Sequence, residues 1–190
     1  MTMVRSFVAV NLSDEVRAAL ARAQDGLRKT GADVRWVYPP NFHLTLVFLG
    51  DVDQDKLGEI AAAIHRAVAG IKPFDVEFVG VGGLPRLDRP RVIYVDVKDE
   101  TGNLAQLNEK IAAAMAAFDV KQEDRKYLPH MTLGRVASPK NLPALMEASK
   151  KLAGQSFGLL NVRSVELMIS DLRPSGPVYS VAARVEFGVN

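Results

Sequence analysis

The stretches Asn41-Phe-His-Leu-Thr-Leu-Val-Phe-Leu-Gly50 and Leu128-Pro-His-Met-Thr-Leu-Gly-Arg135 contain the same motif: a histidine, a hydrophobic residue, a threonine and a leucine. The chain has 3 histidines among its 190 residues. With five threonines in the chain, a threonine stands two places after a given residue by chance in roughly 1 case in 40. Two of the three histidines, His43 and His130, have such a neighbour, so the recurrence is not expected from chance.

A second pair of similar segments precedes the two motifs. Arg5-Ser-Phe-Val-Ala-Val10 resembles Arg91-Val-Ile-Tyr-Val-Asp96 at an offset of 86 residues, and the motifs themselves are offset by 87 residues. In each half the pattern predicts a strand, a helix and then a strand that bears the histidine motif. Two copies at nearly equal offset indicate a duplicated unit with pseudo-two-fold symmetry.

The rest of the chain mixes strands and helices in the manner of an α+β protein. Apolar runs and helical spacings bounded by turn residues predict the elements. Strands are expected at residues 4–10, 34–37, 42–49, 74–81, 92–97, 128–136, 162–170 and 178–187, helices at 13–31, 54–68, 104–118 and 139–154, a turn at 82–85 and a loop at 173–177. Because there is no long β-α-β-α alternation, antiparallel or mixed sheets are favoured. No low-complexity linker divides residues 1–190, so we expect a single domain.

Composition excludes several classes of function. A formal net charge of +2 provides no basic stripe for non-specific binding of duplex nucleic acid, although a local anionic ligand stays open. The lack of cysteine excludes disulfides, thiolate catalysis and Cys-rich zinc sites. No apolar run resembles a signal peptide or approaches the length of a membrane span. We therefore expect a cytoplasmic protein without a membrane partner, and nothing demands more than a monomer.

Strand geometry places each histidine beside its threonine. Residues i and i+2 of a strand face the same side, so His43 and Thr45 project together, as do His130 and Thr132. The hydrophobic residues that alternate with them are expected to be buried behind them. Each motif is thus expected to present an imidazole and a hydroxyl group on one surface.

Two such pairs suit the displacement of a group at phosphorus. Imidazole has an unperturbed pKa of about 6.5, so one ring can be neutral while another is protonated near neutral pH. A neutral His takes a proton from water or a hydroxyl group, and a protonated His gives one to the leaving oxygen. The threonine hydroxyls can donate hydrogen bonds to the non-bridging phosphate oxygens. This chemistry requires neither a metal nor a cofactor.

The histidines have two other interpretations. A histidine on a strand is commonly a packed or hydrogen-bonded structural residue, and we assign a structural or solvent-facing role to His65, which lacks a Thr partner. A metal site would need acidic ligands at a suitable spacing, and neither motif has one. Asp51 and Asp124 could approach the motifs only in space.

At these residues the chain resembles the two-histidine phosphoesterases, specifically the RNA 2′,3′-cyclic phosphodiesterase (2′-5′ RNA ligase) family. The resemblance covers nearly the whole chain, and the His-x-Thr-Leu-x-Phe-Leu-Gly block is quite specific. The segments that carry it are residues 5–10, 41–50, 91–95, 128–135 and 167–179.

The resemblance implies a bilobal fold in which two related antiparallel sheets form a central cleft with helices outside. It also implies hydrolysis of an RNA or nucleotide 2′,3′-cyclic phosphate end to a 2′-phosphate. In this family the residue at His43 is the proton donor to the leaving 3′-oxygen, and the residue at His130 is the proton acceptor that activates water. Thr45 and Thr132 fall on phosphate-binding positions. The reverse reaction joins a 5′-hydroxyl through a 2′-5′ linkage without a nucleotide cofactor.

Further residues are candidates for substrate contact. The resemblance implies that Arg135 helps to bind the anionic substrate. Strict alternation, however, points Arg135 away from His130. Either Gly134 permits a bulge, or Arg135 acts from the rim of the cleft. Phe48 has the same conflict of parity and is interpreted first as core, second as a base-stacking surface. Tyr179 is a candidate base contact or a packing residue.

Two residues near the first motif are further candidates, and other functions stay open. Arg35 and Trp36 precede the Pro-Pro turn and could line the mouth of the cleft. The same site could act on a small cyclic phosphate of the ADP-ribose type or on a 2′-5′-linked oligonucleotide. The fold could instead serve as a nucleotide-binding module, but pure binding does not need two proton-transfer groups.

Overall fold

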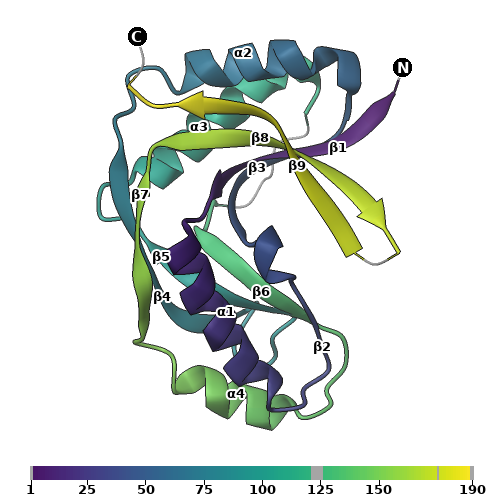
Figure 1. The fold of residues 1–190 in the computed structure, drawn as a ribbon, viewed down its shortest axis with the longest axis vertical. Helices are drawn as coiled ribbons and strands as arrows, with labels where there is room; N and C mark the ends of the chain where they lie inside the picture. The colour runs from purple at the N-terminus through teal and green to yellow at the C-terminus, as the bar shows by residue number, and fades with distance from the viewer. Residues whose placement is uncertain (1, 121–125, 175, 189–190) are drawn as a thin grey trace.

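Two antiparallel sheets form the framework of the protein. A computed structural model of the chain describes residues 2–120, 126–174 and 176–188. The first sheet has the order β3-β1-β8-β9 and the second has the order β2-β6-β5-β4-β7 (Figure 1). The strands are β1 (Met3–Asn11), β2 (Val34–Trp36), β3 (His43–Asp53), β4 (Phe74–Leu84), β5 (Val92–Lys98), β6 (His130–Val136), β7 (Ser156–Val162), β8 (Ser164–Arg173) and β9 (Gly176–Glu186).

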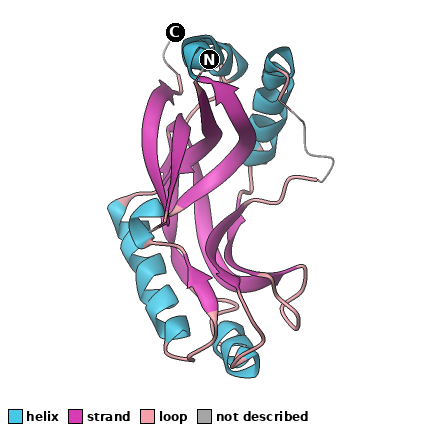
Figure 2. Cartoon of the chain, turned by 90° about the vertical axis from the view of Figure 1, so that its right-hand side faces the viewer, coloured by secondary structure: helices cyan, strands magenta, loops and turns pink. Residues whose placement is uncertain are grey.

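Four α-helices cover the sheets in two pairs. They are α1 (Asp14–Arg28), α2 (Leu57–Ala67), α3 (Asn103–Met115) and α4 (Leu142–Lys150), with 3₁₀ turns at Pro39–Asn41, Gln54–Lys56 and Ala116–Phe118. Helices α2 and α3 contact each other and the first sheet, whereas α1 and α4 contact each other and the second sheet. Figure 2 shows these pairs at opposite ends of the molecule with the strands between them. The α+β prediction is confirmed. Among the described residues no helix is both long and apolar enough to span a membrane.

Helix α1 shows how local sequence sets these elements. The Ser13 side chain accepts a hydrogen bond from the Val16 backbone N–H and caps the helix, and two acidic residues occupy the first turn. Its buried face consists of Val16, Leu20, Gln24 and Leu27. The helix ends at Arg28, three residues before Gly31, which adopts a φ of +67°. The predicted helix is therefore present, and its end lies slightly earlier than expected.

The hydrophobic residues of both motifs lie in one continuous core. Leu44 and Leu46 have relative exposures of 0% and 2%, and Met131 and Leu133 both have 0%. All four belong to the same core cluster, although they come from different sheets. The predicted alternation is confirmed for this part of both strands. Because the hydrophobic side chains of β3 and β6 point into the core, the histidine and threonine of each motif point to the other face of the strand.

The duplication is visible in the strand pairing, with one correction. Strand β1 pairs with β3 as β5 pairs with β6. Asn11 lies opposite His43 and Asp96 lies opposite His130, which offsets β5 from β1 by 85 residues. The predicted offset of 86 residues was wrong, because it would place core-facing residues of one copy on solvent-facing residues of the other.

Strand β7 was not predicted from the sequence. Its residues Ser156–Val162 do not alternate simply: Gly158 adopts a φ of +120° and the apolar Leu159 is 68% exposed. The predicted strand at 162–170 is accordingly split between β7 and β8. The predicted turn at 82–85 belongs largely to β4, which pairs with β5 as far as Leu84. Strands β8 and β9 pair up to the partners Arg173 and Gly176, so their connection is shorter than the predicted loop, of which Ser175 lies outside the described residues.

Candidate active site

His43 begins strand β3, and the turn before it is held by an arginine from α1. The guanidinium of Arg17 donates hydrogen bonds of 3.1 Å to the carbonyl oxygens of Pro39 and Phe42. The Nδ1 atom of His43 lies 2.7 Å from the carbonyl oxygen of Asn41. A carbonyl oxygen can only accept, so Nδ1 carries a proton. The Nε2 atom is therefore the nitrogen that can gain or lose a proton.

His130 is oriented by the same device. Its Nδ1 atom lies 2.8 Å from the carbonyl oxygen of Leu128, again two residues earlier in the chain. Both motifs therefore fix the imidazole by a hydrogen bond to the backbone and leave Nε2 for chemistry. Strands β3 and β6 contact each other across the two sheets. The equivalent geometry of the two rings is what a duplicated unit should produce.

One cleft contains residues of both motifs. A cavity of about 550 Å³ is lined by Thr45 and Phe48 of the first motif and by His130 of the second. Tyr127 donates a hydrogen bond of 3.1 Å to the carbonyl oxygen of Thr45, and Asn108 donates one of 2.7 Å to that of Leu46. These contacts satisfy carbonyl groups at the free edge of β3 and tie the first motif to the segment that leads into the second.

Phe48 faces solvent at this cleft, so its interpretation as a core residue was wrong. In the pairing of β1 with β3, Val8 lies opposite Val47 and Ala9 lies opposite Thr45, which leaves Leu46 as an extra residue. Leu46 and Val47 are consequently both buried, and Phe48 is 54% exposed. The bulge reverses the strand parity and brings Phe48 to the same face as Thr45.

A bulge at the equivalent position brings Arg135 to the same face as Thr132. Tyr94 lies opposite Thr132 and Ile93 lies opposite Gly134, so Leu133 is the extra residue. A β-carbon on Gly134 would lie only 2.6 Å from a Val34 methyl carbon and 2.9 Å from the Trp36 ring. Glycine is thus required by close packing at the bulge, and of the two predicted explanations for Arg135 the structure supports the bulge.

The two residues before the Pro-Pro turn differ in location. Trp36 packs against the hydrophobic core rather than at the mouth of the cleft, so that prediction was wrong for it. Arg35 lies directly opposite Arg135 in the pairing of β2 with β6. Directly paired residues of antiparallel strands share a face, so Arg35 is on the side of the sheet that carries the second motif.

Tyr179 lies beside the first histidine. Its ring makes edge contacts with the rings of His43 at 5.2 Å and Phe7 at 5.1 Å between centroids. Burial raises the pKa of the Tyr179 hydroxyl, and the positive charges of Arg135 and Arg5 oppose that shift. Tyr179 belongs to the first sheet and Arg135 to the second.

The immediate surroundings of the two imidazoles differ. Phe7 also packs on His43, at 4.7 Å between ring centroids. Burial lowers the pKa of His43 most strongly, the charge of Arg17 lowers it further, and the hydrogen bond to the backbone opposes both. His43 therefore favours the neutral form in the free protein. His130 instead lies opposite Asp96, whose pKa is raised by burial and lowered by the charge of His130.

Tyr94 completes the surroundings of the second histidine. Its ring makes an edge contact with His130 at 5.6 Å between centroids. A β-carbon on Gly82 would lie 2.6 Å from the Tyr94 ring, so the tyrosine lies flat against this glycine. Sequence reasoning missed Tyr94 and Asp96, although the alternation of β5 would have placed them on one face. No sequence signal identified Arg17 or Tyr127, whose contacts depend on tertiary packing.

Two of the remaining residues, His65 and Asp51, lie away from the cleft. His65 is an exposed residue in the last turn of α2, which confirms its assignment outside the site. Asp51 lies opposite Arg5 near the far end of β3, and Asp124 lies outside the described residues. Within the described part of the chain, no group of three or more His, Asp or Glu side chains is placed to hold a metal ion.

Comparison with known proteins identifies the family. Residues 18–173 match the model of the 2′-5′ RNA ligase superfamily. The chain belongs to this superfamily. A protein of Methanothermobacter thermautotrophicus named RNA 2′,3′-cyclic phosphodiesterase is 35% identical over 93% of this chain and 95% of its own length. A protein of Thermotoga maritima with the same name is 33% identical over 97% of this chain and 96% of its own. The resemblance on which the sequence predictions rested is confirmed.

Solved structures show the same architecture. The protein TT0787 of Thermus thermophilus is 31% identical and superposes with a TM-score of 0.79 over 96% of this chain and 97% of that one. E. coli LigT, crystallised with 3′-AMP, has a TM-score of 0.79 at 22% identity, with 99% of this chain and all of LigT covered. At that identity the second likeness concerns the fold alone. Together with the two sheets described above, these likenesses confirm the bilobal fold prediction.

Proposed function

We propose that this protein is an RNA 2′,3′-cyclic phosphodiesterase that converts a terminal 2′,3′-cyclic phosphate to a 2′-phosphate. The observation that carries the proposal is the pair of His-x-Thr motifs that meet at one cleft, each with an imidazole anchored through Nδ1. Thr45 and His130, from different motifs, line the same cavity. A binding module would not need two oriented proton-transfer groups. The names of the relatives support the same activity.

In the proposed reaction one bond to phosphorus forms and one breaks. His130 takes a proton from water through Nε2 as the water oxygen attacks phosphorus. The bond from phosphorus to the 3′-oxygen breaks, and His43 gives its Nε2 proton to that oxygen. The product is a 2′-phosphate with a free 3′-hydroxyl. The hydroxyls of Thr45 and Thr132 donate hydrogen bonds to the non-bridging oxygens, with Arg135 adding positive charge.

The electrostatics of the cleft bear on the role of His43. Burial favours its neutral form in the free protein, whereas a proton donor must be protonated. The cyclic phosphate is an anion, and a nearby negative charge raises the pKa of an imidazole. Substrate binding therefore moves His43 toward the protonated form. The donor is charged when the phosphate is present and less so when the cleft is empty.

The same site can also carry out 2′-5′ ligation. A 5′-hydroxyl that occupies the place of water can attack the cyclic phosphate, and the same two histidines then form a 2′-5′ linkage. Because the cyclic phosphate supplies the strain, no nucleotide cofactor takes part. The description of the superfamily as 2′-5′ RNA ligases supports this second reaction.

The test is product identity under chelation. The purified protein is incubated with EDTA and a nucleoside 2′,3′-cyclic phosphate, and the product is identified by phosphorus NMR. We expect the 2′-phosphate at an undiminished rate. A 3′-phosphate product would overturn the assignment of the leaving oxygen, and loss of activity with EDTA would overturn the metal-independent mechanism.

A further inference from the structure

Two arginines lie side by side at the edge of the second sheet. Arg35 of β2 and Arg135 of β6 are direct partners in the antiparallel pairing. Side chains at such positions have β-carbons about 4.5–5.5 Å apart, and like charges directly opposite each other are destabilising. Both residues are exposed. An anion that lies between the two guanidinium groups would relieve this repulsion.

No carboxylate compensates the pair within the described residues. Three other exposed arginines do have acidic partners: Arg86 pairs with Asp88, Arg173 with Asp171 and Arg184 with Glu186. Neither Arg35 nor Arg135 forms an ion pair with any described residue. The two charges are therefore free to bind a ligand.

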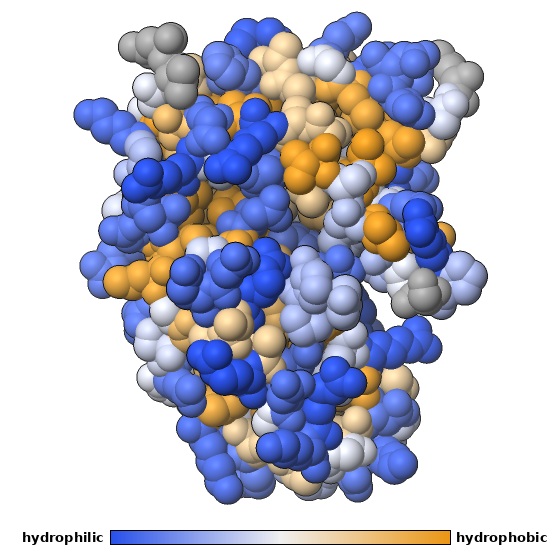
Figure 3. Space-filling model, in the orientation of Figure 1, coloured by the Kyte–Doolittle hydropathy of each residue, from blue (hydrophilic) through white to orange (hydrophobic). Residues whose placement is uncertain are grey.

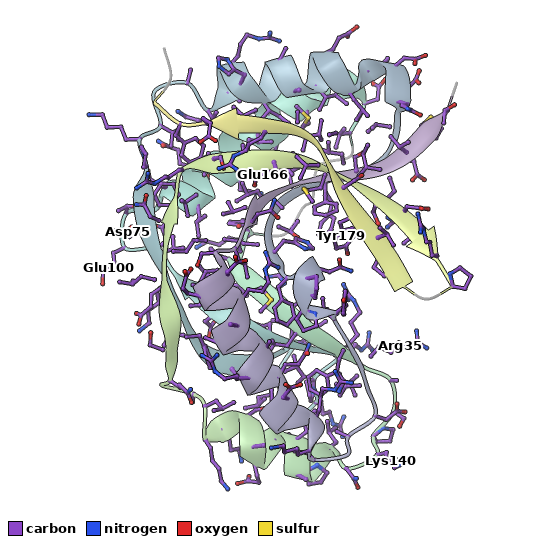
Figure 4. All side chains as sticks on the ribbon, in the orientation of Figure 1. Arg35, Asp75, Glu100, Lys140, Glu166 and Tyr179 are labelled. Carbon is purple, nitrogen blue, oxygen red and sulfur yellow. The ribbon has the colours of Figure 1, made fainter. Side chains whose placement is uncertain are left out.

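The pair lies on one side of the catalytic cleft. The bulge at Leu133 turns Arg135 to the face of the sheet that carries Thr132. On the other face, the Val34 and Trp36 side chains pack against Gly134. In Figure 4, Arg35 extends from β2 toward the open side of the molecule below the β8–β9 hairpin, which carries Tyr179. Figure 3 shows the surface notched between this hairpin and the lower lobe, with mainly hydrophilic residues below the notch.

The other side of the cleft has a different character. The cavity that includes Thr45 and His130 extends past Leu128 and Tyr127 to small residues of α3. Its lining is largely apolar. His130 begins β6 and Arg135 lies near the end of that strand, so the apolar cavity and the arginine pair are at opposite ends of β6. A ribose that carries a cyclic phosphate similarly has its base at one end and its 5′-oxygen at the other.

We propose that Arg35 and Arg135 together bind the phosphodiester that precedes the terminal nucleotide of the substrate, so that the enzyme prefers RNA ends to cyclic mononucleotides. This inference rests on the proposed function. With one residue of the bulge unpaired, Arg135 lies two strand positions beyond Thr132, roughly 7 Å, which is of the order of one nucleotide step. Arginine has five N–H donors, so Arg135 can contact the terminal phosphate and share the preceding one with Arg35.

The test compares two substrates that end in the same nucleotide. One is a nucleoside 2′,3′-cyclic phosphate, and the other is a dinucleotide with the same cyclic end. We expect kcat/KM of the unaltered protein to favour the dinucleotide by at least tenfold. Arg35→Ala should lower that ratio by about tenfold, the typical effect of one charge-assisted contact. The slope of log kcat/KM against log salt for the dinucleotide should become shallower by about 0.7.

Arg66→Ala is the matched control, because Arg66 is an exposed arginine of α2 away from the second sheet. It removes the same charge and should preserve both the ratio and the salt slope. The proposal is overturned if Arg35→Ala keeps the dinucleotide-to-mononucleotide ratio of kcat/KM that the unaltered protein has. It is also overturned if Arg66→Ala lowers that ratio as much as Arg35→Ala does.

A binding measurement separates this inference from the proposed function. Titration calorimetry with the dinucleotide 2′-phosphate and the mononucleotide 2′-phosphate needs no catalysis. If the dinucleotide binds more tightly and Arg35→Ala removes the difference, the subsite stands even when no hydrolysis is seen, and the proposed function alone fails. If both ligands bind equally while the mononucleotide is hydrolysed, the proposed function stands and the subsite is wrong.

Discussion

The first and second histidine motifs share a backbone geometry but present different chemistry to the cleft. In both copies the imidazole Nδ1 is held by the carbonyl two residues earlier, and the leucine that ends the motif is the extra residue of a bulge. The bulges bring Phe48 and Arg135 to equivalent positions. One copy thus exposes an aromatic ring and the other exposes a cation, as a substrate with a base and a phosphate requires.

A second difference lies on the neighbouring strands. Asn11 is the partner of His43, whereas Asp96 is the partner of His130. A neutral amide and a carboxylate therefore stand at equivalent positions beside two otherwise similar rings. The comparison teaches that duplication supplies the geometry of the site, while a few side chains outside the motifs make the two histidines unequal.

Removing either histidine should have the largest effect. We expect His43→Ala and His130→Ala each to lower kcat by roughly 10²–10⁴, because each removes one proton transfer. Their melting temperatures should change little, since both side chains are only partly buried. His65→Ala is the control and should retain full activity. Near-normal turnover in both active-site variants would show that the histidines are not the acid and base.

Removing the cation of the second copy should come next. Arg135→Ala should lower kcat/KM by about 10–100-fold, since a hydrogen bond to a charged group contributes about 1.5–3 kcal/mol. Arg135→Lys retains the positive charge but loses the planar guanidinium group. Its kcat/KM should lie between that of Arg135→Ala and that of the unaltered protein. Steady-state kinetics on a cyclic mononucleotide provides the measurement. Equal activity of the Ala variant and the unaltered protein would place Arg135 outside the site.

Removing the aromatic ring of the first copy should have a smaller effect. Phe48→Ala should raise KM by about tenfold, because stacking on a base contributes roughly 1–3 kcal/mol. The free energy of unfolding should change little, since the ring is 54% exposed. Leu159→Ala, at a residue 68% exposed on β7, is the control. A large loss of stability with unchanged KM would indicate that Phe48 is a packing residue.

Changing the partners of the histidines should affect only the pH profile. Burial lowers the pKa of His43, and kcat/KM reports the free enzyme, so activity should fall at high pH as this proton donor loses its proton. Asn11→Asp places a negative charge beside His43, raises its pKa and should move that limb to higher pH. Asp96→Asn changes the strand partner of His130 instead, is the control, and should leave that limb in place.

The pH profile also tests the assignment of donor and acceptor. If His43 were the acceptor, Asn11→Asp would instead move the low-pH limb, and toward higher pH. Each substitution is close to isosteric, so a general loss of stability is a minor concern. The limb that moves in Asn11→Asp therefore identifies the role of His43.

The sequence predicted the elements whose patterns are regular. Alternation placed His43 beside Thr45 and buried the residues next to them, and the repeat of the motif predicted a duplicated unit. The same alternation failed for Phe48, because it assumes that successive residues always point to opposite faces. The bulge at Leu46 adds one residue and reverses this order after it. At Gly134 the glycine itself indicated that a bulge was permitted. No comparable signal stood at Val47, which is the equivalent residue of the first copy.

Contacts made only in the folded chain could not be predicted. No pattern in the sequence singles out Arg17, yet its guanidinium binds backbone carbonyls of the turn before His43. Tyr127 and Thr45 are 82 residues apart in the chain, and only tertiary structure joins them. The different surroundings of the two histidines likewise include Asp96, a residue outside the motif.

The central claim is that the two motifs act together on one phosphate, and a double-mutant cycle tests it most directly. Turnover of a cyclic nucleotide in EDTA is measured for His43→Ala, His130→Ala and the double variant. Groups that act as a unit are strongly non-additive, so we predict that the double variant loses little more activity than either single variant. Losses that multiply in the double variant would show that the histidines act independently and would contradict the account.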